Sequence, residues 1–334
     1  MAYILTHAEF DTVLQRLKQD YILIGPVRKK NKGKFSDADL ITYGQIESLS
    51  DLETNGKSQF SAKETIFPPS QTLFYFTEDE YREPKFEPQK QIVFLRACDF
   101  NAIKRLDLLF LENGQFVDAY YKRLREKTHF FVFGCEKSYE NCFCVSTGTN
   151  QCEGYDAFLN FKGEKINLFP SEPFKRYFAG YEENEDILPQ FIERNHIQVD
   201  IPEGLSTKIY DHPYWDQYGK RCIGCGRCNF SCPTCTCFTM QDIFYRDNKN
   251  AGERRRVWAS CQVDGFTDMA GGHSYRKQQG ERMRFKVMHK IHDFAKRFNM
   301  HMCVGCGRCD DVCPEYISFS QCISGLKGVV AHDN

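Results

Sequence analysis

Two short runs near the C-terminal end share one spacing of cysteines. The first extends from Cys222 to Pro233 and the second from Cys303 to Pro314, and each follows the pattern C-x2-C-x2-C-x3-C-P. This spacing is typical of chains that bind two [4Fe-4S] clusters, in which the fourth cysteine of each run ligates the cluster of the other run. The sequence therefore predicts two cubanes with crossed ligands: Cys222, Cys225, Cys228 and Cys313 for the first, and Cys303, Cys306, Cys309 and Cys232 for the second.

Two other uses of closely spaced cysteines fit the pattern less well. A structural zinc site takes paired ligands, with the second pair well separated from the first, whereas here four cysteines fall within eleven positions, twice. A disulfide framework is typical of short secreted chains, and this chain has 334 residues and no apolar segment of the kind expected of an N-terminal signal. A zinc-binding structural protein is kept as a remote alternative.

Composition bounds the compartment and the partners. The 17 cysteines indicate a reducing compartment, for which we expect the cytoplasm. A net charge of −1 gives no general attraction to nucleic acid or to a membrane surface. No stretch approaches the roughly 18 consecutive apolar residues that a membrane-spanning helix needs. We therefore expect a soluble protein that binds neither nucleic acid nor a membrane.

Alternating helical and extended patterns predict an α/β layer in the first part of the chain. A capping box from Thr6 to Glu9 opens a helix over roughly residues 7–19. A second helix carries Ile103, Leu106 and Phe110 at helical spacing. Four apolar runs predict strands, at 21–24 (stopped by Gly25-Pro26), 91–95, 128–133 and 155–161. The fold class predicted for residues 1–205 is an α/β domain with a mixed sheet.

A segment rich in Pro, Gly, Asp and Tyr, residues 202–219, leads into the first cysteine run and marks the expected domain boundary. The two runs start 81 positions apart, so a sizeable insert separates them. Within this insert, residues 282–298 place apolar side chains on one helical face: Val287, Ile291, Phe294 and Phe298. We predict a mainly helical, ferredoxin-like domain with two clusters over residues 206–334.

The insert is also basic, with 13 Lys or Arg against 6 Asp or Glu between Arg246 and Arg297. One interpretation is a solvated helix face. Another is that the cations offset the negative charge of the clusters or dock an acidic redox partner. Nucleic-acid binding is a weaker option, because no binding motif or aromatic platform accompanies the charges.

A second group of cysteines follows the predicted strand ends. In α/β sheets the carboxyl ends of the strands line the ligand crevice, so these thiols could converge on a third [4Fe-4S] cluster. The candidate ligands are Cys98, Cys135, Cys142 and Cys144, with Cys152 and Asp99 as competitors. The alternative is that they are buried thiols that pack as small apolar groups. For the remaining cysteines the sequence favours packing or supporting roles: Cys152, Cys235, Cys237, Cys261 and Cys322.

The chain lacks the motifs of several common active sites. No G-x-G-x-x-G follows a strand, no P-loop occurs, and neither a haem attachment motif nor the H-E-x-x-H motif of zinc proteases is present. We therefore expect a protein that carries electrons and has no evident catalytic site of its own.

The ordered combination of segments resembles one family, the A subunits of anaerobic sulfite reductase and their relatives, the β subunits of soluble sulfhydrogenase-type nickel–iron hydrogenases. The similarity covers about residues 65–320. The segments that carry it are Phe67-Pro-Pro, Arg96-Ala-Cys98-Asp99, Gly134-Cys135, Cys142-Phe-Cys144, Cys222 to Cys237, Trp258-Ala-Ser-Cys261, Ala270 to Arg276, Glu281 to Lys286, His289-Lys290 and Cys303 to Pro314.

The resemblance implies a role in anaerobic respiration. It implies a subunit that relays electrons from a flavin-containing, NADH-oxidising subunit to a sirohaem subunit that reduces sulfite to sulfide. The alternative is the equivalent electron-transfer subunit of a hydrogenase. Hydrogenase-type β subunits often carry Arg-Pro-Cys-Asp where this chain has Arg96-Ala-Cys98-Asp99, and this difference favours the sulfite branch.

Overall fold

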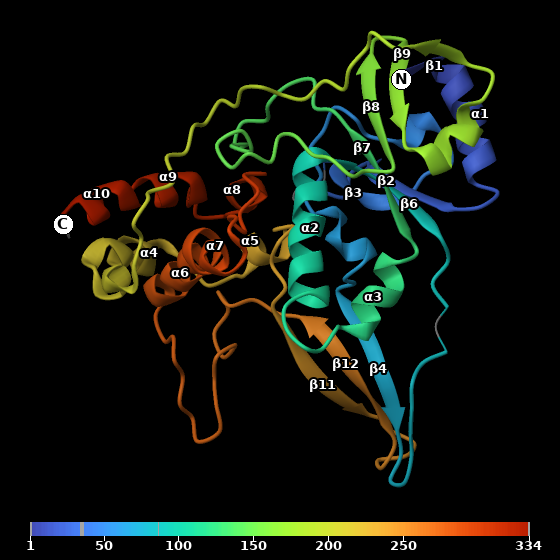
Figure 1. Ribbon diagram of the computed structural model, residues 1–334. Helices are drawn as coiled ribbons and strands as arrows, with labels where there is room; N and C mark the ends of the chain where they lie inside the picture. Colours follow the sequence, from blue (N-terminus) through green and yellow to red (C-terminus); the bar gives the residue numbers. More distant parts are fainter. Residues whose placement is uncertain (1, 34–36, 86, 333–334) are drawn as a thin grey trace.

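A computed structural model describes residues 2–33, 37–85 and 87–332 of the chain. Its N-terminal part is built on an eight-stranded mixed sheet (Figure 1). Neighbours are parallel from β2 through β6 and β7 to β8, and the outer pairs are antiparallel. In spatial order the strands are β10 (Glu182–Asn184), β1 (Ala2–Thr6), β9 (Lys165–Pro170), β8 (Ala157–Lys162), β7 (Thr128–Phe133), β6 (Gln91–Arg96), β2 (Ile22–Lys29) and β3 (Leu40–Gln45). The mixed α/β sheet expected from the sequence is confirmed.

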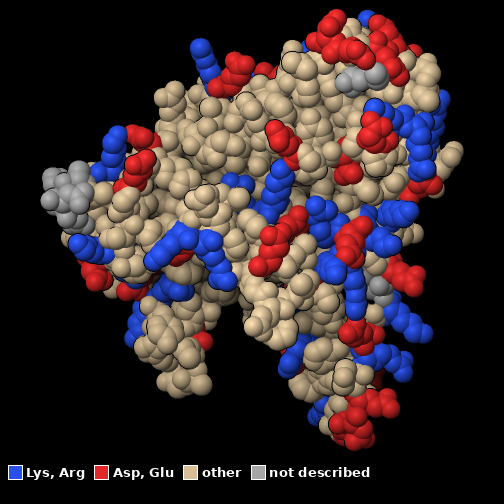
Figure 2. All heavy atoms as spheres, viewed as in Figure 1, with Lys and Arg blue, Asp and Glu red and all other residues tan. Residues whose placement is uncertain are grey.

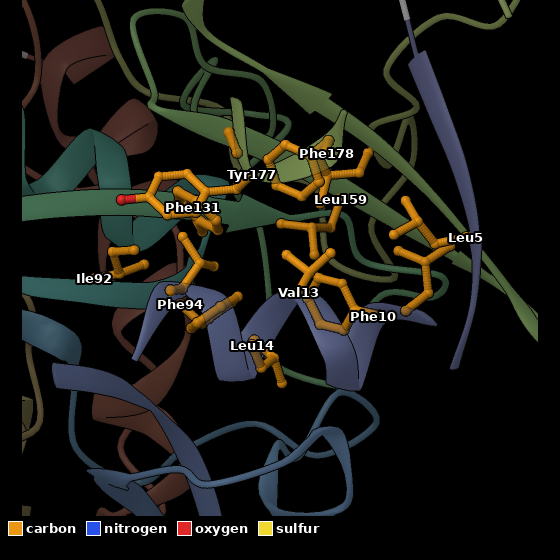
Figure 3. Packing of buried hydrophobic residues seen from close by; sticks show 14 of the residues in the cluster. Leu5, Phe10, Val13, Leu14, Ile92, Phe94, Phe131, Leu159, Tyr177 and Phe178 are labelled. Atoms are coloured by element: carbon orange, nitrogen blue, oxygen red, sulfur yellow. The ribbon is translucent and has the colours of Figure 1, made fainter. Parts of the chain in front are cut away.

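One face of this sheet is covered by α1 (His7–Leu17). Thr6 caps the helix by accepting from the backbone N–H of Glu9, and the Glu9 carboxylate accepts from the backbone N–H of Thr6, which is the predicted capping box. Phe10 and Val13 of the helix lie beside the strand residues Phe94 and Leu159, as Figure 3 shows, and Leu14 belongs to the same buried cluster. The spacing of these apolar residues in α1 is what buries this face.

The opposite face is covered by α2 (Ala97–Leu111) and α3 (Ala119–Arg125). Phe100, Ile103 and Leu106 of α2 pack on the strand residues Val93 and Leu95 in a second apolar core. The helix α2 begins directly at the carboxyl end of β6, so Cys98 and Asp99 stand in its first turn. The sheet thereby fixes one cysteine of the predicted third group.

A second sheet joins segments that are far apart in the sequence. Strands β4 (Ser70–Phe76) and β5 (Tyr81–Arg82) pair with the hairpin β11 (Phe238–Phe244) and β12 (Gly252–Trp258), all antiparallel. The four strands project from the body of the molecule (Figure 1). This hairpin lies in the first half of the insert between the cysteine runs, for which the sequence predicted no strand. It contributes strands to a sheet shared with residues from before the expected boundary at 205/206.

The C-terminal part around the cysteine runs is mainly helical, as predicted. Residues 279–298 form one continuous rod in which a π-helical segment (His289–Asp293) connects α6 (Gln279–Met288) to α7 (Phe294–Phe298). The remaining helices are α4 (Asp216–Arg221), α5 (Arg227–Phe230), α8 (Arg308–Asp311), α9 (Phe319–Ser324) and α10 (Leu326–His332). Short 3-10 turns occupy Leu49–Asp51, Ala62–Thr65, Glu172–Phe178, Thr207–Asp211 and Pro213–Trp215.

Strand β2 differs from its prediction. It does not stop at Gly25-Pro26 but continues to Lys29. The parallel partner β6 pairs only with residues 22–24, so beyond Ile24 the strand is paired with β3 alone. Pro26, which has no N–H to donate, is tolerated where one side of the strand has no ladder partner.

Within the described residues, the helices are all too short or too polar to cross a bilayer.

Candidate iron–sulfur sites

The four cysteines predicted for the first cluster face one cavity. Its lining includes Cys222, Cys225, Cys228 and Cys313, together with Lys286. The thiol of Cys222 lies among the thiols of the other three. The structure thus brings Cys313 of the second run to the three leading cysteines of the first run, as the crossed assignment requires.

The reciprocal group forms around Cys232. This last cysteine of the first run lies close enough to Cys303, Cys306 and Cys309 to interact electrostatically with all three thiols. Cys309 also reaches the lining of the first cavity. The short helices α5 and α8, one from each run, lie side by side and close the two runs on each other (Figure 1).

Two glycines allow the second cysteine run to lie close to residues 141–144. Gly307 has φ +69°, and a Cβ built on it would come within 2.1 Å of the carbonyl oxygen of Asn141. Gly305 has φ +59°, and a Cβ there would come within 2.5 Å of the carbonyl oxygen of Phe143. The positive φ and the lack of room for a Cβ both require glycine at these two positions. The second run therefore lies directly against residues 141–144.

The donor sets fit iron–sulfur clusters. In a cubane each thiolate binds a different iron, so the ligand sulfurs surround the cluster and need not converge on one point. Among residues 2–33, 37–85 and 87–332, no three Cys, His, Asp or Glu side chains are grouped as ligands of a single metal ion. Four thiols around one cavity are the arrangement that a cluster requires.

Buried lysines supply the positive charge that such clusters need. Lys286 and Lys290 are 3% and 2% exposed. Burial opposes the charged form of Lys290, but the neighbouring groups Cys232, Cys235 and Cys303 outweigh it and raise the pKa of this lysine above its usual range. Lys286 lies beside Cys228 and Cys309, and the same balance of burial and thiols raises its pKa. A buried ammonium is stable only beside an anion, so both lysines fit the negative charge of metal-bound thiolates.

This placement decides between two interpretations of the basic insert. Lys286 and Lys290 of the rod formed by residues 279–298 turn inward to the cysteines, so a wholly solvated face is the wrong description for them. On the face shown in Figure 2, Lys and Arg side chains are interspersed with Asp and Glu. The inward lysines match the expectation that cations of the insert offset cluster charge.

The third group of cysteines also comes together. Cys144 lies near Cys98, Cys135 and Cys142, and Cys135 lies near Cys142. Arg96 donates from Nη1 to the sulfur of Cys135 at 3.2 Å. Lys57 donates from Nζ to the sulfur of Cys142 at 3.7 Å. These four cysteines, one from the first turn of α2 and three from the connection between β7 and β8, are therefore neighbours with two cations against them.

The two competing ligands are engaged elsewhere. Asp99 accepts two hydrogen bonds from the guanidinium of Arg308, at 2.7 and 2.8 Å, and both residues are fully buried. Cys152 packs in the apolar core under α2 and α3. The structure thus assembles Cys98, Cys135, Cys142 and Cys144 without either competitor.

The third group borders directly on the second. The thiol of Cys142 lies 3.5 Å from the carbonyl oxygen of Cys306, and the backbone N–H of Phe143 donates to the carbonyl oxygen of Gly305 at 2.7 Å. Cys98 packs beside Cys306. The three groups therefore lie in the order third, second, first, each in contact with the next.

Burial favours the protonated thiol at several of the proposed ligands. It raises the pKa of Cys303 and of Cys144 to about 11 and that of Cys306 to about 12. Burial and the adjacent Asp99 raise the pKa of Cys98 well above its usual range. Iron must therefore displace protons from these thiols when it binds.

Three cysteines for which the sequence favoured packing or supporting roles lie together in the structure. Cys235, Cys237 and Cys261 form a fourth group beside Cys232, with the side chains of Cys237 and Cys261 in mutual hydrogen-bond contact. The signal that could have found them is the C-x-C that follows the first run, although its partner Cys261 lies 24 positions further on.

Comparison with known proteins agrees with this geometry. Residues 221–317 match the family model of the 4Fe-4S dicluster domain, so this part of the chain carries two [4Fe-4S] clusters. Over 351 aligned residues the chain is 28% identical to the sulfhydrogenase 2 subunit beta of Pyrococcus furiosus, which covers 98% of this chain and 99% of that protein. No solved structure matches the chain.

The similarity favours the second of the two branches that the sequence pattern implied, because the relative bears the name of a sulfhydrogenase and not of a sulfite reductase. The chain is therefore an iron–sulfur electron-transfer subunit with a dicluster domain, and a distant homologue of the sulfhydrogenase β subunit.

Proposed function

We propose that this chain is the electron relay of a hydrogenase-type complex, passing electrons between a flavin-containing subunit that reacts with a nicotinamide nucleotide and a catalytic subunit. The observation that carries the proposal is the unbroken succession of cysteine groups, from Cys98 at the sheet through Cys306 to Cys222. Similarity to a sulfhydrogenase subunit over nearly the whole length of both chains supports it.

The chain's own residues hold and tune the carriers. When bound, a [4Fe-4S] cluster accepts and releases one electron at a time, with a potential set by surrounding charges and hydrogen bonds. Cys222, Cys225, Cys228 and Cys313 would hold one cluster, and Cys303, Cys306, Cys309 and Cys232 the other. Lys286 and Lys290 are buried and positively charged, so they would raise the reduction potentials of these clusters. Cys98, Cys135, Cys142 and Cys144 would hold a third.

A second candidate is the relay subunit of an anaerobic sulfite reductase. The observation that favours it is Ala97 in Arg96-Ala-Cys98-Asp99, where hydrogenase-type subunits often carry proline. Here the partners would be a flavin NADH-oxidising subunit and a sirohaem subunit. In both candidates the chain carries electrons without a substrate site of its own.

Purification of the native complex through a tag on this chain, under anaerobic conditions, separates the two candidates. Nickel in the complex and hydrogen-dependent reduction of a nicotinamide nucleotide are the expected results. Sirohaem with NADH-dependent sulfite reduction would instead establish the second candidate.

A variant tests the relay itself in the same complex. Cys303→Ser is expected to abolish the coupled reaction while the catalytic subunit still reacts with an artificial electron carrier. Full coupled activity in a Cys303→Ser complex that has demonstrably lost a cluster would refute the relay role.

A further inference from the structure

Five cysteines lie outside the three groups described above, and two of them have apolar surroundings. Cys152 packs in the core under α2 and α3. Cys322 is fully buried in the core around α9, next to the hydroxyls of Tyr214 and Tyr218. Both behave as the packing thiols that the sequence predicted.

The other three lie next to one another in a series of contacts. Cys237 and Cys261 are in side-chain contact, Cys235 interacts with Cys237, and Cys235 also contacts Cys232. On the other side, Cys261 lies near Cys228. This fourth group, Cys235, Cys237 and Cys261, therefore stands between the first and second predicted clusters. Its members come from the segment directly after the first run and from the segment after β12.

Hydrogen-bond donors are aimed at one of these sulfurs. Asn229 donates from Nδ2 to the sulfur of Cys261 at 3.0 Å, and Gln262 donates from Nε2 to the same sulfur at 3.6 Å. Asn229 and Gln262 are each 1% exposed. Buried amide donors that converge on a sulfur stabilise a thiolate and can orient it as a metal ligand.

One buried N–H in the segment that leads to Cys261 lacks a hydrogen-bond partner among the described residues. It is the indole Nε1 of Trp258, three positions before Cys261. Buried polar groups are rarely left without hydrogen bonds, and an unpaired N–H is expected where a bound group supplies the acceptor. Inorganic sulfide of a cluster is such an acceptor.

A buried cation faces the same group. Lys63 is 2% exposed, its Nζ donates to the carbonyl oxygens of Cys232 and Cys235 at 2.9 and 2.8 Å, and it lies 4.1 Å from the ring centre of Trp258. The ionisable groups acting on it are the thiols of Cys235, Cys232 and Cys237 and the ammonium of Lys290. Metal-bound thiolates at these positions would place negative charge beside Lys63.

We propose that Cys235, Cys237 and Cys261 bind a further iron–sulfur cluster, beside the two of the dicluster domain and the candidate at the sheet. The proposal rests on the proposed function only in requiring that the chain carries iron–sulfur clusters. Three thiolates hold three irons of such a cluster, and the amide donors and Lys63 stabilise its negative charge. A zinc site is disfavoured because four ligands would have to converge on one ion.

The test is the metal content of the anaerobically purified full-length chain and its variants. Cys237→Ser and Cys261→Ser are each expected to remove about three or four irons per chain, the content of one cluster, with matching sulfide. The double variant should lose no more iron than either single variant, because both ligands serve one cluster. Cys152→Ser and Cys322→Ser are the matched controls and should keep the full iron content.

Unchanged iron and sulfide in both Cys237→Ser and Cys261→Ser would overturn the proposal, as would the loss of one zinc in place of iron. Cys261 is fully buried, so if its variant does not fold, Cys235→Ser and Cys237→Ser, at half-buried positions, carry the test. Cys222→Ser and Cys303→Ser complete the set. If Cys222→Ser and Cys303→Ser also retain all iron, the proposed function fails. If these two variants lose iron and the variants of the fourth group do not, only the proposal for the fourth group fails.

Discussion

At the scale of single residues, Arg308 connects the second cysteine run to the N-terminal sheet. Its guanidinium donates to both carboxylate oxygens of Asp99 and, from Nε and Nη2, to the carbonyl and hydroxyl oxygens of Ser58 at 2.8 and 3.0 Å. Arg308 and Asp99 are almost fully buried, so each charge depends on the other. Sequence alone offered Asp99 as a metal ligand; the structure gives it a positioning role.

Removal of either Asp99 or Arg308 alone should therefore lower the stability of the folded chain. Asp99→Leu leaves the Arg308 charge buried without its counterion, and we expect a loss of about 3–5 kcal/mol in the free energy of unfolding. Anaerobic urea denaturation of the holoprotein measures this loss. The double variant Asp99→Leu/Arg308→Met, which has no buried charge left, should recover part of it. A single variant as stable as the unaltered chain would contradict this account of the pair.

Cluster loading should depend on pH through the ligand thiols. Because burial raises the pKa of Cys303 to about 11 and that of Cys306 to about 12, the proton is the competitor of iron throughout the neutral range. As the pH falls, thiolate becomes about tenfold scarcer per pH unit at Cys303 and Cys306, so loading weakens; as the pH rises toward 9 it strengthens. Anaerobic reconstitution with iron and sulfide from pH 7 to pH 9 checks the direction. A rate that is independent of pH would argue against protonated ligands.

At the scale of elements, the loop of the second run fits against residues 141–144 with no room for a side chain at Gly307. Gly307→Ala is expected to displace this loop and to lose the second cluster, because the added Cβ meets the carbonyl oxygen of Asn141 at 2.1 Å. Gly148→Ala is the matched control: its φ of +64° brings the same backbone strain, but nothing lies within 4 Å of the added Cβ. Iron content and EPR signals compare the two. Equal loss in both variants would show that strain, and not contact, is decisive.

The rod formed by residues 279–298 carries Lys290 to the second cluster. Lys290→Met removes a buried positive charge beside Cys232 and Cys303, so the midpoint potential of one cluster should fall while the iron content stays the same. Lys296→Met, at an exposed position two residues after the start of α7, should leave every potential unchanged. EPR-monitored redox titration of both variants decides. If all midpoint potentials are unchanged in Lys290→Met, Lys290 does not tune a cluster.

At the scale of the whole molecule, local sequence patterns predicted individual strands, helices and cysteine motifs, but not the pairing of distant segments. Strands β6, β7 and β8 and the rod of residues 279–298 follow from periodicity, and the cysteine runs follow from spacing. Pairing of β4 with β12 could not be predicted, because the partners lie about 180 positions apart and neither strand signals the other. A count of charges likewise cannot tell that Lys286 and Lys290 turn inward. The domain boundary at 205/206 stays a prediction.

The arrangement of the cysteine groups also exceeds what spacing conveys. Contact of Cys142 with the carbonyl oxygen of Cys306 depends on the fold of the sheet, the position of α2 and the glycines of the second run together. That contact converts separate metal motifs into one path across the molecule. We therefore expect electrons to pass through the second cluster between the third group and the first.

The central claim is that this chain is a carrier of several iron–sulfur clusters, and its metal content tests that claim most directly. Iron, acid-labile sulfide and zinc are measured in the anaerobically purified full-length chain, with EPR after reduction. The account predicts at least about eight irons with equal sulfide, rising to about twelve or more when the groups beyond the dicluster domain are loaded, and paramagnetic signals on reduction. Iron near zero with stoichiometric zinc would contradict it.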